Sequence, residues 1–141
     1  MLKTILVAID GSEIATRVIQ TLENLVLSPE TKVILCHVFP TGESDTELPA
    51  DRPQPESARF SSFHIEQQLQ SFQEQLSVKT HIELVAGEPA DEIIRLANIH
   101  QADLIIIGSR GLTGMKRIVL GSVSNQVVEE AGCSVLVVKP H

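Results

Sequence analysis

Short apolar runs rich in β-branched residues recur along the chain, and segments with apolar residues at helical spacing separate them. Runs of this length and composition indicate strands that are buried on both faces of a sheet. They are predicted at 4–10, 32–39, 80–86, 103–108 and 134–138. Strands that alternate with helices need right-handed crossovers. The pattern therefore predicts a single α/β domain with an open, parallel, five-stranded, Rossmann-like sheet and helices on both faces.

The segments between the strands are predicted to be helical at about 15–26, 60–77, 90–97 and 122–131. Ser12 is a candidate N-cap for the first of these helices. The stretch 40–56 carries four prolines and several acids but almost no large apolar side chain. It is predicted to be a long, exposed, flexible loop within one domain that covers 1–141.

The composition narrows the classes of partner. A formal net charge of −7 removes any general attraction to nucleic acid or to acidic lipid surfaces, so neither is predicted as a partner. The N-terminus lacks the long apolar segment of a signal peptide, and no apolar run approaches the roughly 20 residues of a membrane helix. Cys36 and Cys133 are assigned to predicted buried strands, which favours reduced thiols. A cytoplasmic protein is predicted.

Glycines and serines gather where the fourth predicted strand ends and the last predicted helix begins. In open parallel sheets, ligands bind beyond the carboxyl ends of the strands. Gly108 and Gly111 can adopt a positive φ and let the backbone approach a ligand. The segment 121–124 opens a helix whose first N–H groups lack intrahelical partners, and Ser122 and Ser124 add hydroxyls. These features favour a phosphate site over simple turns.

The spacing of these residues is specific. Neither GxxxxGK[ST] nor a GxGxxG after the first strand is present, which argues against P-loop and dinucleotide sites. The spacing Gly108-x2-Gly111-x9-Gly121-Ser122 resembles the G-2x-G-9x-G(S/T) motif of ATP-binding universal stress proteins. The resemblance extends over the whole chain, through ILVAIDGS, the HV that ends the second strand, GEPADEII, DLIIIGSRG, GSVS and SVLVVKP. It implies an adenine nucleotide alpha hydrolase-like sheet.

The resemblance also implies a set of ligand contacts. Ala8 and Asp10 would line the adenosine pocket, with Asp10 near the ribose or a phosphate-bound Mg²⁺, and Val38 would meet adenine through its backbone. Arg110 is either a further phosphate partner or a solvated loop charge. The implied ATP-binding residues are Ala8, Asp10, Val38, Gly108, Arg110, Gly111, Gly121, Ser122, Val123 and Ser124. AMP or ADP could replace ATP, and the last strand, 134–138, is expected to pair two copies into a homodimer.

Two functions stay open for such a site. One is a nucleotide-dependent stress or signalling module whose protein partner the sequence does not identify. The other is a slow ATPase or phosphotransferase that uses Mg²⁺, although no residue stands out as a base and no catalytic residue is predicted. A phospho-receiver would use Asp10 and Lys139, but the third strand ends in Ala86-Gly87 without a phosphorylatable aspartate. The five histidines lack metal-ligand spacing; His37 lies beside the expected adenine position.

Overall fold

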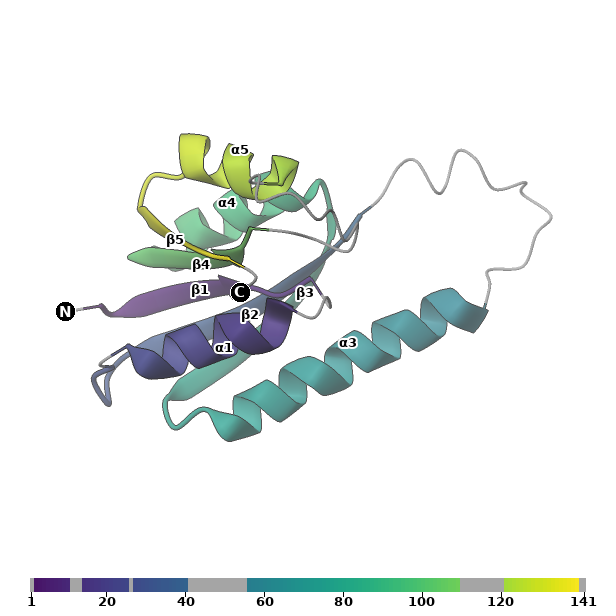
Figure 1. Cartoon of the computed structure of the whole chain (residues 1–141), viewed down its shortest axis with the longest axis horizontal. Coiled ribbons are helices and arrows are strands. Elements are labelled where there is room, and N and C mark those ends of the chain that lie inside the picture. The colour runs from purple at the N-terminus through teal and green to yellow at the C-terminus, as the bar shows by residue number, and fades with distance from the viewer. Residues whose placement is uncertain (1, 11–13, 26, 41–55, 110–120, 140–141) are drawn as a thin grey trace.

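A five-stranded parallel sheet forms the centre of the molecule (Figure 1). The computed structural model describes residues 2–10, 14–25, 27–40, 56–109 and 121–139, with the backbone alone at 40 and over 56–62. The strands are β1 (Thr4–Ala8), β2 (Lys32–Pro40), β3 (Lys79–Gly87), β4 (Leu104–Gly108) and β5 (Ser134–Val138). Their order across the sheet is β3-β2-β1-β4-β5, and every neighbouring pair is parallel. The predicted fold class is confirmed.

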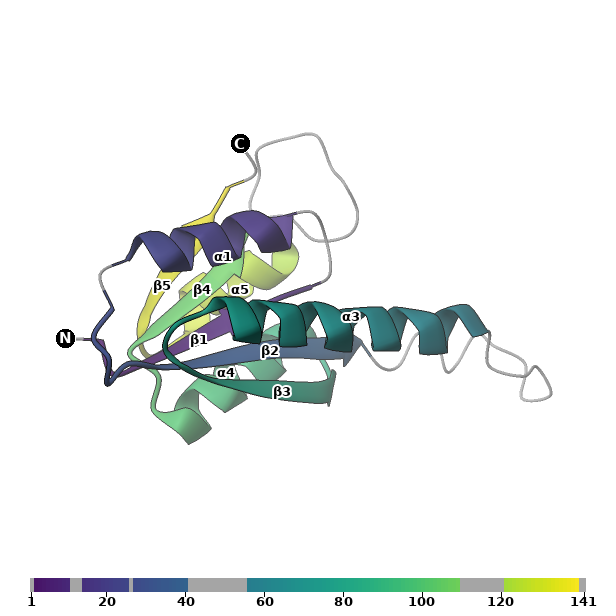
Figure 2. The same ribbon diagram turned by 90° about the horizontal axis from the view of Figure 1, so that it is seen from below.

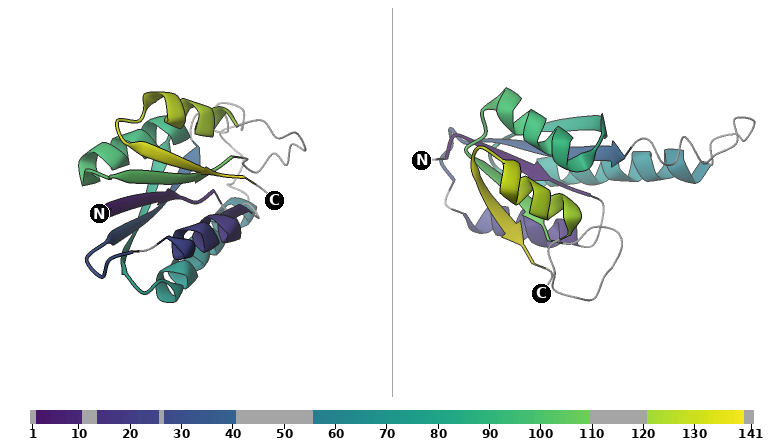
Figure 3. Two further views of the ribbon diagram at one scale, coloured as in Figure 1. Left: turned by 60° about the vertical axis from the view of Figure 1, so that its left-hand side comes forward. Right: turned by 90° about the horizontal axis from the view of Figure 1, so that it is seen from above.

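Helices cover both faces of this sheet. They are α1 (Ile14–Asn24), α3 (Glu56–Gln75), α4 (Pro89–His100) and α5 (Ser122–Glu130). Figure 2 shows α1 and α3 on one face, and the first turns of α3 extend past the end of the sheet. The other face carries α4 and α5, which lie side by side (Figure 3) and share a hydrogen bond of 3.1 Å from Gln126 to Asp91.

Two hydrophobic cores result, because successive strand residues point to opposite faces. On β1, Ile5 and Val7 pack with α1 and α3, whereas Leu6 packs with α4 and α5. All three side chains are fully buried. The helices match this pattern through apolar residues three and four apart, such as Val18 and Leu22 of α1. Branched aliphatic residues can therefore build both cores with few aromatics.

The predicted elements agree with the structure within a few residues. The largest differences are that α3 begins at Glu56 rather than at about 60, that α4 continues to His100 rather than to 97, and that β1 ends at Ala8 rather than at residue 10. The last predicted strand lies at a sheet edge, and β4 lies inside the sheet between β1 and β5. The proposed cap Ser12 and most of the predicted loop, 41–55, lie outside the described residues. No helix among the described residues is long and apolar enough to span a membrane.

The two cysteines are free thiols. Cys36 on β2 is fully buried, and this burial raises the pKa of its thiol to about 12, so the reactive thiolate is absent near neutral pH. Cys133 differs from the prediction: it precedes β5 instead of lying in it, and it is only half-buried.

Asp103, just before β4, joins the start of this strand to the start of β1. Its carboxylate Oδ2 accepts hydrogen bonds from the backbone N–H groups of Lys3, at 2.9 Å, and Thr4, at 3.0 Å. The N–H of Asp103 in turn donates to the Thr4 carbonyl at 2.8 Å. The two bonds to the carboxylate hold the pKa of Asp103 below its usual range.

We expect Asp103→Asn to lower the melting temperature at neutral pH, since the neutral amide accepts weaker bonds than the carboxylate. Because the folded-state pKa lies below the ordinary value of 3.8, the contribution is complete above that value and is lost as the pH falls through the folded pKa. Thermal melts of both proteins from neutral to strongly acidic pH should therefore converge. A difference that stays constant on acidification would contradict this account.

Candidate functional site

The ends of β1 and β4 form the point at which the strand order reverses. The chain adds β2 and β3 on one side of β1 and then β4 and β5 on the other. Ala8 pairs with Ile107, so Ile9 and Asp10 leave the sheet beside Gly108. Such a switch point leaves a crevice outside the carboxyl ends of the strands, where ligands bind. The predicted site residues Ala8, Asp10 and Gly108 thus meet at one edge.

The start of α5 is fastened to the same edge. The N–H of Gly121 donates to the Ser109 carbonyl at 2.8 Å, and the N–H of Ser109 donates to the Val138 carbonyl at 2.8 Å. One short chain of backbone bonds therefore joins the helix to the ends of β4 and β5. Ser109 is almost fully buried by this arrangement.

The first turn of α5 is suited to an anion. Gly121 is its N-cap, with φ −63° and ψ 161°, and there is no side-chain capping bond. The N–H groups of the first turn, at 122–124, therefore lack the usual cap. The first turn also holds no acidic residue, so no side-chain carboxylate competes for the positive end of the helix dipole. This combination supports phosphate binding by backbone amides.

The two predicted serine hydroxyls differ in their surroundings. Ser122 is exposed at the start of the helix. Ser124 is 2% exposed, and its Oγ donates to the Gly121 carbonyl at 3.1 Å. The hydroxyl proton of Ser124 is thus engaged by the backbone in this structure, which leaves Ser122 as the exposed hydroxyl of the pair. A contact of Ser124 with phosphate would use its N–H group.

Gly108 is explained by packing against α1. A Cβ built at Gly108 would lie 2.9 Å from Cγ2 of Ile14, closer than real Cβ atoms come, and 3.1 Å from Cδ1, which is also a tight contact. Among the described glycines the positive φ belongs to Gly87, so the expected need for a positive φ does not apply to Gly108. The glycine lets α1 approach the end of β4, which brings the N-terminal end of α1 to the candidate site.

Asp10 supplies a carboxylate at the end of β1. It is half-buried and has an interaction partner of its own. No group of three His, Cys, Asp or Glu side chains able to hold a metal occurs in the described part of the chain. A single carboxylate nevertheless fits Mg²⁺ that is carried by phosphates, because this ion keeps waters and often takes one or two protein carboxylates.

The structure describes only some of the remaining predicted site residues. Val38 is buried in the core under α4 and α5, with its backbone near the end of β2. Arg110 and Gly111 lie outside the described residues, as do the basic residues Lys116 and Arg117.

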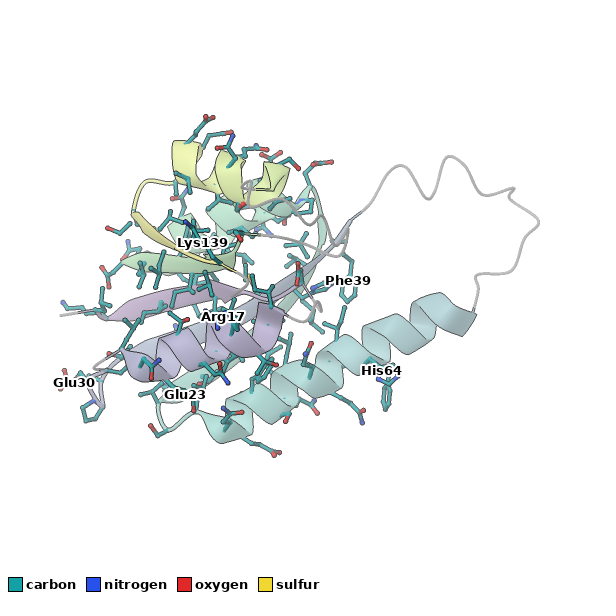
Figure 4. All side chains as sticks on the ribbon, viewed as in Figure 1. Arg17, Glu23, Glu30, Phe39, His64 and Lys139 are labelled. Atoms are coloured by element: carbon teal, nitrogen blue, oxygen red, sulfur yellow. The ribbon has the colours of Figure 1, made fainter. Side chains whose placement is uncertain are left out.

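Arg17 was not predicted from the sequence. Its Nε donates to the Lys139 carbonyl at 2.9 Å and so ties α1 to the chain beyond β5; both residues are labelled in Figure 4. They are 122 positions apart, and neither belongs to a local motif. The contact adds positive charge near the strand ends of a chain whose formal charge is −7.

Sequence comparisons place this arrangement in a family. Residues 1–139 match the Universal stress protein family. Universal stress protein Sll1388 of Synechocystis sp. is 32% identical to this chain over 96% of each protein. Universal stress protein MJ0531 of Methanocaldococcus jannaschii is 50% identical over 66 residues, which are 47% of this chain and 39% of that relative.

Solved structures share the fold along nearly the full length. The protein MJ0577 of M. jannaschii has a TM-score of 0.79 and 28% identity, and the alignment covers 99% of this chain and 96% of that one. A universal stress protein family member from Arabidopsis thaliana, solved with AMP bound, has a TM-score of 0.69 at 23% identity and covers 99% of this chain and 92% of that one.

Proposed function

The chain belongs to the universal stress protein family, and on that premise we propose that it binds an adenine nucleotide at the carboxyl ends of β1 and β4. The observation that carries this proposal is the uncapped start of α5, which the bond from Gly121 N–H to the Ser109 carbonyl fastens to the end of β4. The Arabidopsis relative with bound AMP supports adenosine as the base-bearing part of the ligand.

We assign the phosphates to the first turn of α5. The backbone N–H groups of Gly121, Ser122, Val123 and Ser124 and the exposed Ser122 hydroxyl would donate to phosphate oxygens. Gly121 would need to shift from its bond with Ser109 to take part, whereas the other amides face the ligand through the ordinary geometry of a helix start.

We assign the adenosine end of the nucleotide mainly to the ends of β1 and β2. Ala8 and Asp10 would border the adenosine, the backbone of Val38 would meet the adenine, and Gly108 would lie along the ribose. Asp10 would stand near the ribose hydroxyls or accept phosphate-bound Mg²⁺, which when bound would neutralise phosphate charge. Arg110 and Gly111 complete the set on the strength of the sequence motif alone.

ATP is the proposed nucleotide, and a stress or signalling module is the proposed role. Each added phosphate offers more oxygens to the amides of α5, so we expect the order of affinity ATP above ADP above AMP. Equilibrium titrations of the three nucleotides test this order. Equal affinities would mean that the phosphates lie outside the α5 site, and preferred AMP would move the proposal to the monophosphate. We place this module in the cytoplasm.

We also propose that β5 pairs with β5 of a second copy. The residues Val135 and Val137 on this edge strand are half-buried. Because Ser109 N–H donates to the Val138 carbonyl, the backbone groups of 134, 136 and 138 face β4 and those of 135 and 137 face outward. The outward groups form an edge that a second strand can extend.

Val135→Pro should therefore separate such a dimer without disturbing the ladder to β4, since proline removes an outward N–H. Sedimentation at a concentration where the wild-type protein is dimeric should give the 15.4 kDa monomer for this variant. Val135→Ala is the matched control, because it trims the side chain and keeps the N–H. A proline variant with the full dimer mass, or a monomeric wild-type protein, would contradict pairing through β5.

A further inference from the structure

His37 is a buried imidazole on the apolar side of β2. It is 6% exposed and lies on the face of the sheet that carries α1 and α3, as do Val33 and Leu35. Its ring stands edge-on to Phe39, with centroids 4.6 Å apart and an angle of 78° between the planes. Phe39 is labelled at the end of β2 in Figure 4. A polar ring at such a place needs a partner, because an unpaired buried polar group is costly.

That partner is the end of β1. The Nδ1 atom of His37 lies 2.7 Å from the carbonyl oxygen of Ile9. A carbonyl oxygen can only accept a hydrogen bond, so the proton of this bond is on Nδ1. The bond joins two residues at the edge where β1 turns toward Asp10.

The same carbonyl would otherwise continue the strand ladder. The registered pairing of β1 and β2 stops at Ala8 and Cys36, and the last bond runs from Ile9 N–H to the Cys36 carbonyl at 2.8 Å. The next bond of a regular parallel ladder would join Val38 N–H to the Ile9 carbonyl. Among the backbone bonds of 2–10 and 27–40 that bond is not formed. The imidazole has taken its place.

We propose that His37 is a positioning residue of the nucleotide site. By holding the Ile9 carbonyl, it fixes the point where β1 and β2 separate and keeps β1 from occupying the N–H of Val38. The Val38 backbone points in the same direction as that of Cys36, toward the space beyond the end of β1. Adenine carries acceptor nitrogens and a donor amino group that a strand backbone can pair with. This inference rests on the proposed nucleotide function for its ligand.

Three substitutions separate this role from simple packing. His37→Asn keeps an amide N–H close to the position of Nδ1, whereas His37→Gln moves the amide outward by one methylene group. His37→Leu fills the space without a donor. If the imidazole positions the strand ends, His37→Asn should keep the ATP affinity and the Val38 amide exchange of the wild-type protein, whereas His37→Gln and His37→Leu should change both. A purely structural role would rank the variants by stability instead, which urea unfolding measures alongside.

Two measurements on wild-type and variant proteins test the proposal. Calorimetric titration should show ATP affinity about tenfold or more lower in the Leu and Gln variants, with Asn within about threefold of wild type. Hydrogen exchange of the Val38 amide, followed by NMR without ligand, should be slower in the Leu and Gln variants because the Ile9 carbonyl returns to the ladder.

Equal ATP affinities and unchanged Val38 exchange in all variants would overturn the proposal. So would losses of ATP affinity that follow the losses of stability, with no recovery of affinity in His37→Asn. If the wild-type protein does not bind ATP but Val38 exchange is still slower in the Leu and Gln variants, the proposed nucleotide function is wrong. The control of strand separation by His37 would then stand on its own. The Asn–Gln comparison remains decisive even if the Leu variant does not fold.

Discussion

Gly121→Val should bind ATP at least about 100-fold more weakly than the wild-type protein, a loss of about 2.7 kcal/mol. A Cβ at Gly121 would lie 3.2 Å from the backbone oxygen of Ser109 and 3.8 Å from Oγ of Ser124. The two further methyl groups of valine must then move the start of α5 or project into the space before its first amides. Either change disturbs the proposed phosphate contacts. Calorimetry with ATP measures the loss.

The matched control is Gly132→Val, in the turn between α5 and β5. A Cβ at Gly132 would meet nothing within 4 Å, so the same substitution adds bulk without contact. We expect wild-type affinity for this control and a folded, cooperative melt for both variants. Undiminished ATP affinity in Gly121→Val would remove α5 from the site.

Gly108→Ala should destabilise the fold by about 1–3 kcal/mol, the usual cost of overpacking a tight core. The added methyl would lie 2.9 Å from Cγ2 of Ile14, a residue that α1 holds in the core beneath β1 and β4. β4 cannot yield freely, because it is paired with β1 and β5 and packed on both of its faces. Urea unfolding of the variant and the wild-type protein measures the cost.

A double-mutant cycle shows whether Ile14 is the cause. Ile14→Ala removes the three side-chain atoms that the new methyl would meet, although it also leaves a cavity. The double variant should therefore be more stable than the sum of the two single losses predicts, by about 1 kcal/mol or more. Strict additivity, or full stability of Gly108→Ala, would contradict the packing explanation.

The sequence predicted the fold well because each element carries its own periodicity. The strand 134–138 and the start of a helix at Ser122 agree with the structure residue for residue. Runs of branched aliphatic residues separated by helical stripes leave few alternatives to a parallel sheet with two helical layers. These signals are local, so one chain is enough to detect them.

The errors occur where distant residues decide the local structure. β1 ends at Ala8, and just beyond it the Ile9 carbonyl bonds to a side chain on β2, that of His37, instead of to the strand backbone. Gly108 is a glycine because Ile14 lies against it, which no property of the glycine motif reveals. The Ser124 hydroxyl donates to the Gly121 carbonyl three residues earlier, and the contact of Ser124 with phosphate stays a prediction.

The sequence predicts where the candidate site lies but not the contacts that shape it. The rule for strand ends and the glycine spacing bring Ala8, Asp10, Gly108 and Gly121 to one edge, and the topology accounts for this. The contacts that shape the edge join different elements of the chain, such as Ile9 with His37, Ser109 with Val138 and Arg17 with Lys139. Sequence spacing carries no information about them.

Calorimetric titration of nucleotide-free protein with Mg-ATP, followed by an assay of released phosphate, is the decisive test of nucleotide binding at the start of α5. We expect binding at micromolar concentration or tighter with little phosphate released, as for a nucleotide-dependent module. Binding with sustained release would instead identify a slow ATPase at the same site. Well-folded protein that takes up no nucleotide would contradict the assignment of the α5 start as a phosphate site.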